Sequence, residues 1–306
     1  MKNGRQAAEF YVAQYGMPYD DALSMVISEA FLRRAAIAYG PFMLKGSYAL
    51  RQYLTPEQRQ IRLPADLDWV GMAPQDRPAL DRWVRAITTL TYIDDGVVFR
   101  DFKDNCFWRT NADYAMEDDF PTFNTDLLAF VGDEALEISV DVSFNLMLVP
   151  PPVPLTYLAA QGDHFVLPYT CPLELQISWK LHQSLIRPRF KDLLDLIWLL
   201  QRHDFDAQVC WQALIAECQT DRADIRYLRY LLDCSLAKHP RIASGLMNYQ
   251  ELCCQWEGSG KWSQWGGEKQ VVLLPDVIDA TPDSLLRGID KALRQSALMP
   301  LISAVI

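Results

Sequence analysis

Three aspartates on two predicted strands are the residues of this sequence whose spacing most clearly indicates chemistry. Asp66 and Asp68 lie two positions apart, and residues two apart on a strand point to the same side. Asp141 is centred in Glu137–Phe144, where apolar and polar residues alternate. Neighbouring carboxylates repel each other unless a cation lies between them, and Mg²⁺ prefers such oxygen ligands. The pattern therefore indicates a metal site, for magnesium or for manganese in its place, that serves phosphoryl or nucleotidyl transfer.

A Gly46–Ser47 turn lies upstream of these aspartates. Glycine lets backbone N–H groups approach a triphosphate closely, and the serine adds a hydroxyl. Two aspartates at this spacing occur by chance in many chains, so Asp66 and Asp68 alone also fit a solvated strand end. Together with the turn and Asp141 they fit two-metal nucleotidyl transfer, in which two carboxylates bridge the ions and a third orients the attacking hydroxyl.

The composition is that of a globular, acidic protein. Its 306 residues are half hydrophobic and carry a formal charge of −10. This charge argues against a protein that coats nucleic acid, so a polyanionic partner must meet a local basic patch. Seven cysteines without CxxC spacing favour neither a disulfide framework nor a zinc site. No apolar run of about 18 residues is present, and we expect a soluble cytoplasmic protein without membrane contact.

The elements that must position the aspartates are strands in the first half of the chain and helices in the second. We predict strands at 42–44, 66–72, 97–100, 106–110, 126–130 and 137–144, with helices at 21–38, 48–54 and 78–90. The proline-rich segment Pro150–Pro154 predicts a stiff connector outside regular structure. Beyond it we predict a strand at 165–167 and helices at 172–186, 190–202, 206–218, 222–239 and 282–295.

Two basic stretches could meet phosphate groups. From Lys180 to Lys191 the sequence contains four cationic residues and no acidic one. Arg222, Arg226 and Arg229 recur at helical spacing within the predicted helix at 222–239. A solvated helix face explains this second stretch, and an RNA backbone track is its functional alternative.

Four motifs follow one another in a characteristic order. They are the turn in Phe42–Leu50, the strand motif Arg62–Asp68, the lysine helix Trp179–His182 and the helix Arg189–Asp195. This order resembles the AbiEii/AbiGii family of nucleotidyltransferase toxins, although Pro64 replaces the serine expected two residues before the first aspartate. The resemblance implies an α+β fold, with a DNA polymerase β-like nucleotidyltransferase domain containing a mixed sheet over residues 1–154. A mainly α-helical domain is expected over 155–306.

The resemblance also implies a role for each motif residue. Catalysis is assigned to Asp66, Asp68, Asp141, Lys180 and Asp195, the first three of which are also the expected metal ligands. Nucleotide binding is assigned to Lys45, Gly46, Ser47, Arg62, Lys180 and Asp192. The implied substrate is an NTP, the implied acceptor is an RNA, tRNA included, or a protein hydroxyl, and the implied partner is a cognate antitoxin of a type IV toxin–antitoxin system.

Purely structural roles are alternatives to these functional roles. Lys180 could be a surface lysine whose stem lies along an apolar helix face, and Asp192 and Asp195 could pair with Arg189 and Lys191 as an ion network. Two other functions also fit the chain: a nucleotidyltransferase that modifies a small molecule such as an antibiotic, and a non-catalytic nucleotide-binding relative. No P-loop, GxSxG or HExxH motif is present.

Overall fold

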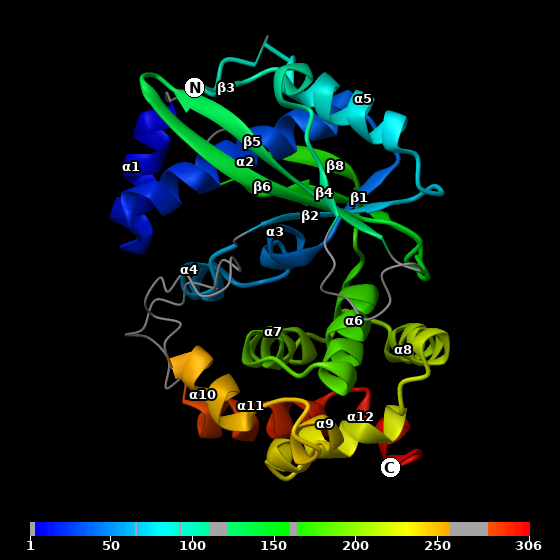
Figure 1. The fold of residues 1–306 in the computed structure, drawn as a ribbon. Helices are drawn as coiled ribbons and strands as arrows, with labels where there is room; N and C mark the ends of the chain where they lie inside the picture. The colour runs from blue at the N-terminus through cyan, green and yellow to red at the C-terminus, as the bar shows by residue number, and fades with distance from the viewer. Residues whose placement is uncertain (1–3, 65, 92, 111–120, 160–163, 258–280) are drawn as a thin grey trace. The chain divides into compact units, whose positions relative to one another are not determined.

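The computed structural model describes residues 4–64, 66–91, 93–110, 121–159, 164–257 and 281–306 (Figure 1). The chain divides into two compact units. The first is built from Met1–Gln52, Pro64–Leu148 and Pro152–Cys171, and the second from Tyr53–Leu63, Val149–Pro151 and Pro172–Ile306. None of the helices in the described ranges combines the length and the apolar character needed to span a bilayer.

The first unit contains an eight-stranded mixed sheet in the order β3-β5-β6-β2-β1-β8-β7, with β4 paired to β5. Its strands are β1 (Phe42–Leu44), β2 (Leu67–Gly71), β3 (Val98–Phe99), β4 (Arg109–Thr110), β5 (Thr122–Val131), β6 (Glu134–Ser143), β7 (Val153–Tyr157) and β8 (Phe165–Thr170). The pairs β2–β6 and β1–β8 are parallel, and the other pairs are antiparallel. The sheet thus continues beyond residue 154, because β8 pairs with β1.

Helices of the first unit are α1 (Gly4–Tyr15), α2 (Tyr19–Ala38), α3 (Gly46–Arg51), α5 (Arg77–Thr88) and the 3₁₀ turn η1 (Phe102–Asn105). The long helix α2 packs against α5, β6 and β8 (Figure 1). An aromatic cluster joins these layers: Phe31 of α2 contacts Trp69, Trp83 and Phe99 edge to face, at ring-centroid distances of 6.0–6.2 Å. Such pairs each contribute about 0.5–1.5 kcal/mol beyond the area they bury. The cluster anchors the buried side of β2, which carries Trp69.

The second unit is helical. It contains α4 (Pro56–Ile61), α6 (Leu173–Ile186), α7 (Phe190–Leu200), α8 (Ala207–Asp221), α9 (Pro240–Ala243), α10 (Tyr249–Glu257), α11 (Pro282–Gln295) and α12 (Met299–Ser303), with the 3₁₀ turns η2 (Ile225–Leu231) and η3 (Leu236–Lys238). Helix α6 packs against both α7 and α8, and α11 packs against α7 (Figure 1). A mixed sheet followed by helices confirms the predicted α+β class.

Two local predictions are wrong. The segment Pro150–Pro154 was expected to lie outside regular structure, but Val153 and Pro154 belong to β7. This strand is at the edge of the sheet and its register shifts between Val153 and Leu155, so the missing N–H of Pro154 breaks no ladder.

The predicted helix at 222–239 is also wrong. Helix α8 ends at Asp221, Arg222 adopts the left-handed conformation with φ 60°, and the chain continues as the 3₁₀ turns η2 and η3. Arg226 and Arg229 therefore lie on a 3₁₀ turn, and Arg226 pairs with Asp224. The α-helical spacing that suggested an RNA track along these arginines is absent.

Candidate active site

Asp68 and Asp141 lie directly opposite each other on the neighbouring parallel strands β2 and β6. The apolar neighbours Leu67 and Trp69 are buried, whereas Asp68 is half-buried and faces the other side of the sheet. Asp66 is also half-buried and directly precedes β2. Alternation along both strands thus places two carboxylates side by side, with a third at the entrance to β2.

Gly46 is packed against the carboxylate of Asp68. Its φ of +67° is one that residues with a side chain rarely adopt, and a Cβ placed there would lie 2.0 Å from Asp68 Oδ2. The preceding residue reinforces the contact: the Lys45 N–H donates to the Asp68 carbonyl oxygen at 2.8 Å, and Lys45 Nζ lies 3.4 Å from Asp68 Oδ1. Ser47 follows as the second residue of α3 and is half-buried. The turn and the carboxylates therefore form one local structure.

The electrostatics of Asp141 reflect this crowding. Burial raises the pKa of Asp141 and the nearby charge of Asp68 raises it further, which outweighs the hydrogen bond from Asn124 and the charge of Lys45. A carboxyl group in this position holds a proton more readily than an ordinary aspartate does, unless a cation lies near it.

This arrangement can be tested against a divalent metal ion. Within the described ranges, no three His, Cys, Asp or Glu side chains are arranged to hold a metal ion among themselves. Mg²⁺ is commonly held by one or two carboxylates, with substrate phosphates and water completing its shell. The facing pair Asp68 and Asp141 provides that donor set, and a cation between the two carboxylates would offset the repulsion by which Asp68 raises the pKa of Asp141. The two carboxylates therefore fit a divalent metal ion whose other ligands come from substrate phosphates and water.

Two residues beside Asp141 were not predicted from the sequence. Asn124 of β5 pairs opposite Asp141, and its Nδ2 donates to Asp141 Oδ1 at 2.7 Å. Arg109 of β4 donates from Nε to Asn124 Oδ1 at 3.0 Å and also pairs with Asp126. The predicted strand began at Asp126, which left Asn124 outside it, and the sequence contains no signal for the β5–β6 register.

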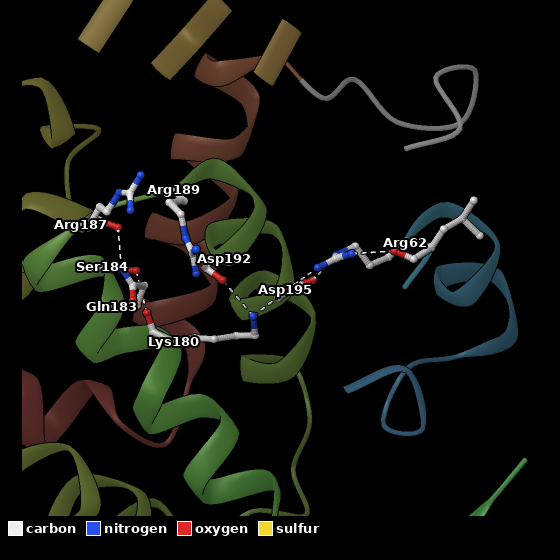
Figure 2. A network of polar contacts seen from close by, with 9 residues as sticks. Arg62, Lys180, Gln183, Ser184, Arg187, Arg189, Asp192 and Asp195 are labelled. Carbon is white, nitrogen blue, oxygen red and sulfur yellow. Dashed lines mark hydrogen bonds and ion pairs between the residues drawn. The ribbon is translucent and has the colours of Figure 1, made fainter. Parts of the chain in front are cut away.

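A second polar group lies in the helical unit (Figure 2). Lys180 Nζ on α6 donates to Asp195 Oδ2 at 2.8 Å and to Asp192 Oδ1 at 3.0 Å, both on α7. Arg62 binds the two oxygens of Asp195 at 3.0 and 3.4 Å, and Arg189 donates to Asp192 Oδ2 at 2.6 Å. Figure 2 shows the lysine between the two aspartates, with the arginines on the outer sides.

Burial makes the charges of this second group interact strongly with one another. The side chain of Asp195 is fully buried and that of Asp192 is 4% exposed. Burial would raise the pKa of Asp192, but the charges of Lys180, Arg189 and Lys191 lower it well below its usual range. Burial likewise lowers the pKa of Lys180, yet the charges of Asp195 and Asp192 outweigh it and the net pKa is raised. The ionised forms of Asp192 and Lys180 are therefore each stabilised by the opposite charges around them.

The predicted site residues thus form two groups. Lys45, Gly46, Ser47, Asp66, Asp68 and Asp141 belong to the first unit, whereas Arg62, Lys180, Asp192 and Asp195 belong to the second. Of the alternatives for Lys180, the structure excludes an exposed lysine, since its side chain is only 16% exposed and held by two aspartates. Lys180 donates a hydrogen bond to Asp195, and an ion pair between Arg189 and Asp192 is present as well.

Residues 30–245 match the family described as nucleotidyl transferase AbiEii toxin, type IV TA system. No curated protein matches the chain.

Two solved structures resemble the fold. One is MenT4, a nucleotidyltransferase toxin from Mycobacterium tuberculosis, with 16% identity, a TM-score of 0.49 and coverage of 98% of this chain and 94% of that chain. The other is JHP933 from Helicobacter pylori, with 14% identity, a TM-score of 0.44 and coverage of 91% of each chain.

Proposed function

The chain belongs to the AbiEii family of nucleotidyltransferase toxins, and on that premise we propose that it transfers a nucleotide from an NTP to a hydroxyl group of RNA, tRNA included, or of a protein. In this proposal it acts as the toxin of a type IV toxin–antitoxin system. The observation that carries the proposal is the placement of Asp68 directly opposite Asp141, with the Gly46 turn packed against Asp68.

The transfer itself is a substitution at the α-phosphorus of the NTP. The acceptor hydroxyl oxygen forms a bond to that phosphorus, and the bond from the phosphorus to the pyrophosphate oxygen breaks. Asp141 receives the hydroxyl proton, for which the raised pKa of its carboxyl group is suitable. Its Oδ1 already accepts a hydrogen bond from Asn124, so Oδ2 is the oxygen assigned to the proton. Positioning and electrostatic stabilisation supply most of the acceleration in reactions of this kind.

A divalent metal ion completes the proposed site. Asp68 and Asp141, with Asp66 beside them, are assigned as its protein ligands. Magnesium, or manganese in its place, would neutralise charge on the phosphates and lower the pKa of the acceptor hydroxyl when bound. Lys45, Gly46 and Ser47 are assigned to the triphosphate, where backbone N–H groups, a hydroxyl and a point charge suit phosphate oxygens.

The second polar group keeps its predicted role in nucleotide binding as a proposal. Lys180 is assigned to phosphate, and Asp195 is assigned to hold Lys180. Arg62 and Asp192 complete the group, since each neutralises one of its charges. A cognate antitoxin and a cytoplasmic location are proposed on the same premise, because the family is that of a toxin–antitoxin system and because NTPs and RNA are cytoplasmic substrates.

Labelled NTPs test this proposal directly. Each α-³²P-labelled NTP is incubated with the protein, magnesium and total RNA, and label is followed into RNA and into protein. We expect the wild-type chain to label an acceptor, and Asp66→Ala with Asp68→Ala to abolish the label together with any growth arrest on expression. Asp133→Asn, an exposed aspartate in the β5–β6 turn, is the matched control and keeps both. Full toxicity of the double variant would overturn the catalytic assignment.

Two further measurements, labelling of candidate small molecules and thermal unfolding with each NTP, separate the two alternative functions. Label that enters candidate small molecules, with RNA and protein unlabelled, would identify an antibiotic-type nucleotidyltransferase. Metal-dependent thermal stabilisation by one NTP, with no product of any kind, would identify a non-catalytic relative.

A further inference from the structure

Asn124 is a nearly buried strand residue whose side-chain amide uses both of its N–H donors. It lies opposite Asp141 in the β5–β6 ladder and is 9% exposed. Its Nδ2 donates two hydrogen bonds, to Asp141 Oδ1 and to Ser139 Oγ, each at 2.7 Å. A side-chain amide nitrogen carries two N–H donors, so both are used.

The orientation of this amide follows from chemistry. Asn124 Oδ1 accepts from Arg109, whose Nε lies 3.0 Å away. Arginine can only donate hydrogen bonds and an ionised carboxylate can only accept them. The guanidinium of Arg109 therefore requires the amide oxygen on its side, and Asp141 requires the amide nitrogen on the other. Exchanging the two amide ends would bring two donors together at Arg109 and two acceptors together at Asp141.

This arrangement leaves the Asp141 carboxylate with one committed oxygen. Oδ1 is held by Asn124, whereas no hydrogen bond to Oδ2 is found within the described ranges. Transfer reactions depend on the reacting groups being held close to their productive geometry, and small misplacements reduce rates strongly. A carboxylate fixed through one oxygen presents the other in a defined direction.

We propose that Asn124 is a positioning residue for the transfer reaction: held by Arg109, it fixes the Asp141 carboxylate so that Oδ2 faces the attacking hydroxyl. This inference rests on the proposed function, since it assigns a partner to the carboxylate that receives the proton. A purely structural role for Asn124 would instead consist in linking β4, β5 and β6. The two roles make different predictions for turnover and for stability.

Two substitutions separate the roles. Asn124→Leu has nearly the same size and removes the donor and the acceptor. Asn124→Asp keeps the acceptor for Arg109 but replaces the donor to Asp141 by a carboxylate. Loss of a partner that orients a site residue typically lowers activity by about tenfold to a hundredfold. We expect kcat to fall by at least about tenfold in both variants, with the NTP KM within about twofold of wild type. If linking the strands were its only role, Asn124→Asp would keep wild-type kcat.

A binding measurement supplies a readout that does not depend on turnover. Calorimetric titration with magnesium and a non-hydrolysable analogue of the transferred NTP should give unchanged affinity for Asn124→Leu. Thermal unfolding shows whether the variant is folded. The matched control is Asp126→Asn, an amide-for-carboxylate exchange on the same face of β5 that touches Arg109 and leaves the bond from Asn124 to Asp141 in place. It should keep kcat within about twofold of wild type, because it does not alter the partner of Asp141.

Each outcome decides the question. Wild-type kcat in folded Asn124→Leu, or a change confined to the NTP KM, would overturn the positioning role. Equal losses in Asp126→Asn and Asn124→Asp would assign the effect to local charge and overturn it as well. If the wild-type chain transfers no nucleotide to any acceptor, the proposed function itself fails, which the wild-type assay reveals before any variant is made.

Discussion

Lys180 and Asp195 form an ion pair of 2.8 Å in which the carboxylate is completely buried. The same carboxylate binds Arg62 at 3.0 Å, so two cations from separate segments of the helical unit share one buried anion. Charges removed from water are tolerated only when they are paired and hydrogen-bonded. Asp195 is therefore the buried anion that Lys180 and Arg62 share as a charge partner.

Asp195→Asn should destabilise the protein strongly. The substitution leaves Lys180 and Arg62 buried with less negative charge between them, and breaking a buried pair on one side costs about 3–5 kcal/mol. Urea unfolding followed by circular dichroism measures the loss. Arg294→Gln is the control, since Arg294 pairs with Asp233 and Asp290 at the surface, where such pairs contribute up to about 1 kcal/mol. Equal losses in the two variants would contradict the central position of Asp195.

The contribution of Asp192 to the stability of the protein should be lost in acid. The pKa of Asp192 is lowered in the folded state, mainly by Lys180 and Arg189 acting against burial. Its contribution to stability is therefore fully present above the unfolded aspartate pKa of about 3.9 and is lost as the pH falls below that value towards the lower folded pKa. Asp192→Asn should lower the free energy of unfolding at pH 7, and the difference from wild type should shrink near pH 3.5. A difference independent of pH would contradict this origin.

Asp141→Asn should separate activity from stability. The folded pKa of Asp141 is raised by burial and by Asp68, so its ionisation costs folded-state stability at neutral pH. The amide keeps an oxygen that can accept from Asn124, while the repulsion from Asp68 is removed. Transfer activity should be lost, and the metal-free protein should be at least as stable as wild type at pH 7. That gain should decline as the pH falls below the folded pKa of Asp141 and disappear near the unfolded aspartate pKa of about 3.9, where the wild-type carboxyl is protonated in both states.

Local sequence patterns predicted the strands with clear alternation of apolar and polar residues and the helices with clear capping residues. Ile138, Val140 and Val142 are buried in β6 as their alternation predicts, and Asp141 faces the other way. The register that sets Asp141 opposite Asp68 depends on the parallel pairing of strands far apart in sequence, which no local pattern encodes. Asn124 escaped notice for the same reason, because its role arises only from the residue across the ladder.

The two wrong predictions, the helix at 222–239 and the connector at 150–154, have different physical causes. Arg222 takes a left-handed conformation, and the Asp224 side chain then accepts from the Arg226 N–H and starts a new 3₁₀ turn, so helical spacing alone overestimated the helix. Pro154 was expected to exclude a strand, but an edge strand tolerates a residue without an N–H group. The first error therefore has a local cause in the backbone, whereas the second depends on the position of β7 at the edge of the sheet.

Gly46→Ala tests the contact on which the proposed site depends. The added Cβ would lie 2.0 Å from Asp68 Oδ2, so either the carboxylate or the turn must move. An alanine at φ +67° also costs about 1–2 kcal/mol of backbone energy. We expect transfer activity to fall by at least about a hundredfold, since misplacing a reacting group by about 1 Å has an effect of that size. Initial rates with labelled NTP measure the loss.

Gly132→Ala isolates the backbone cost in the same unit. Gly132 has a similar φ of +61°, but no heavy atom lies within 4 Å of an added Cβ, so this variant bears the conformational cost without touching a carboxylate. Both variants should lose about 1–2 kcal/mol of stability from the backbone conformation, and Gly132→Ala should keep its transfer rate. If the two variants lost activity equally, reduced stability would explain the effect, and the close packing of Gly46 against Asp68 would have no catalytic importance. If only Gly46→Ala loses activity, the contact with Asp68 is what the reaction requires at this position.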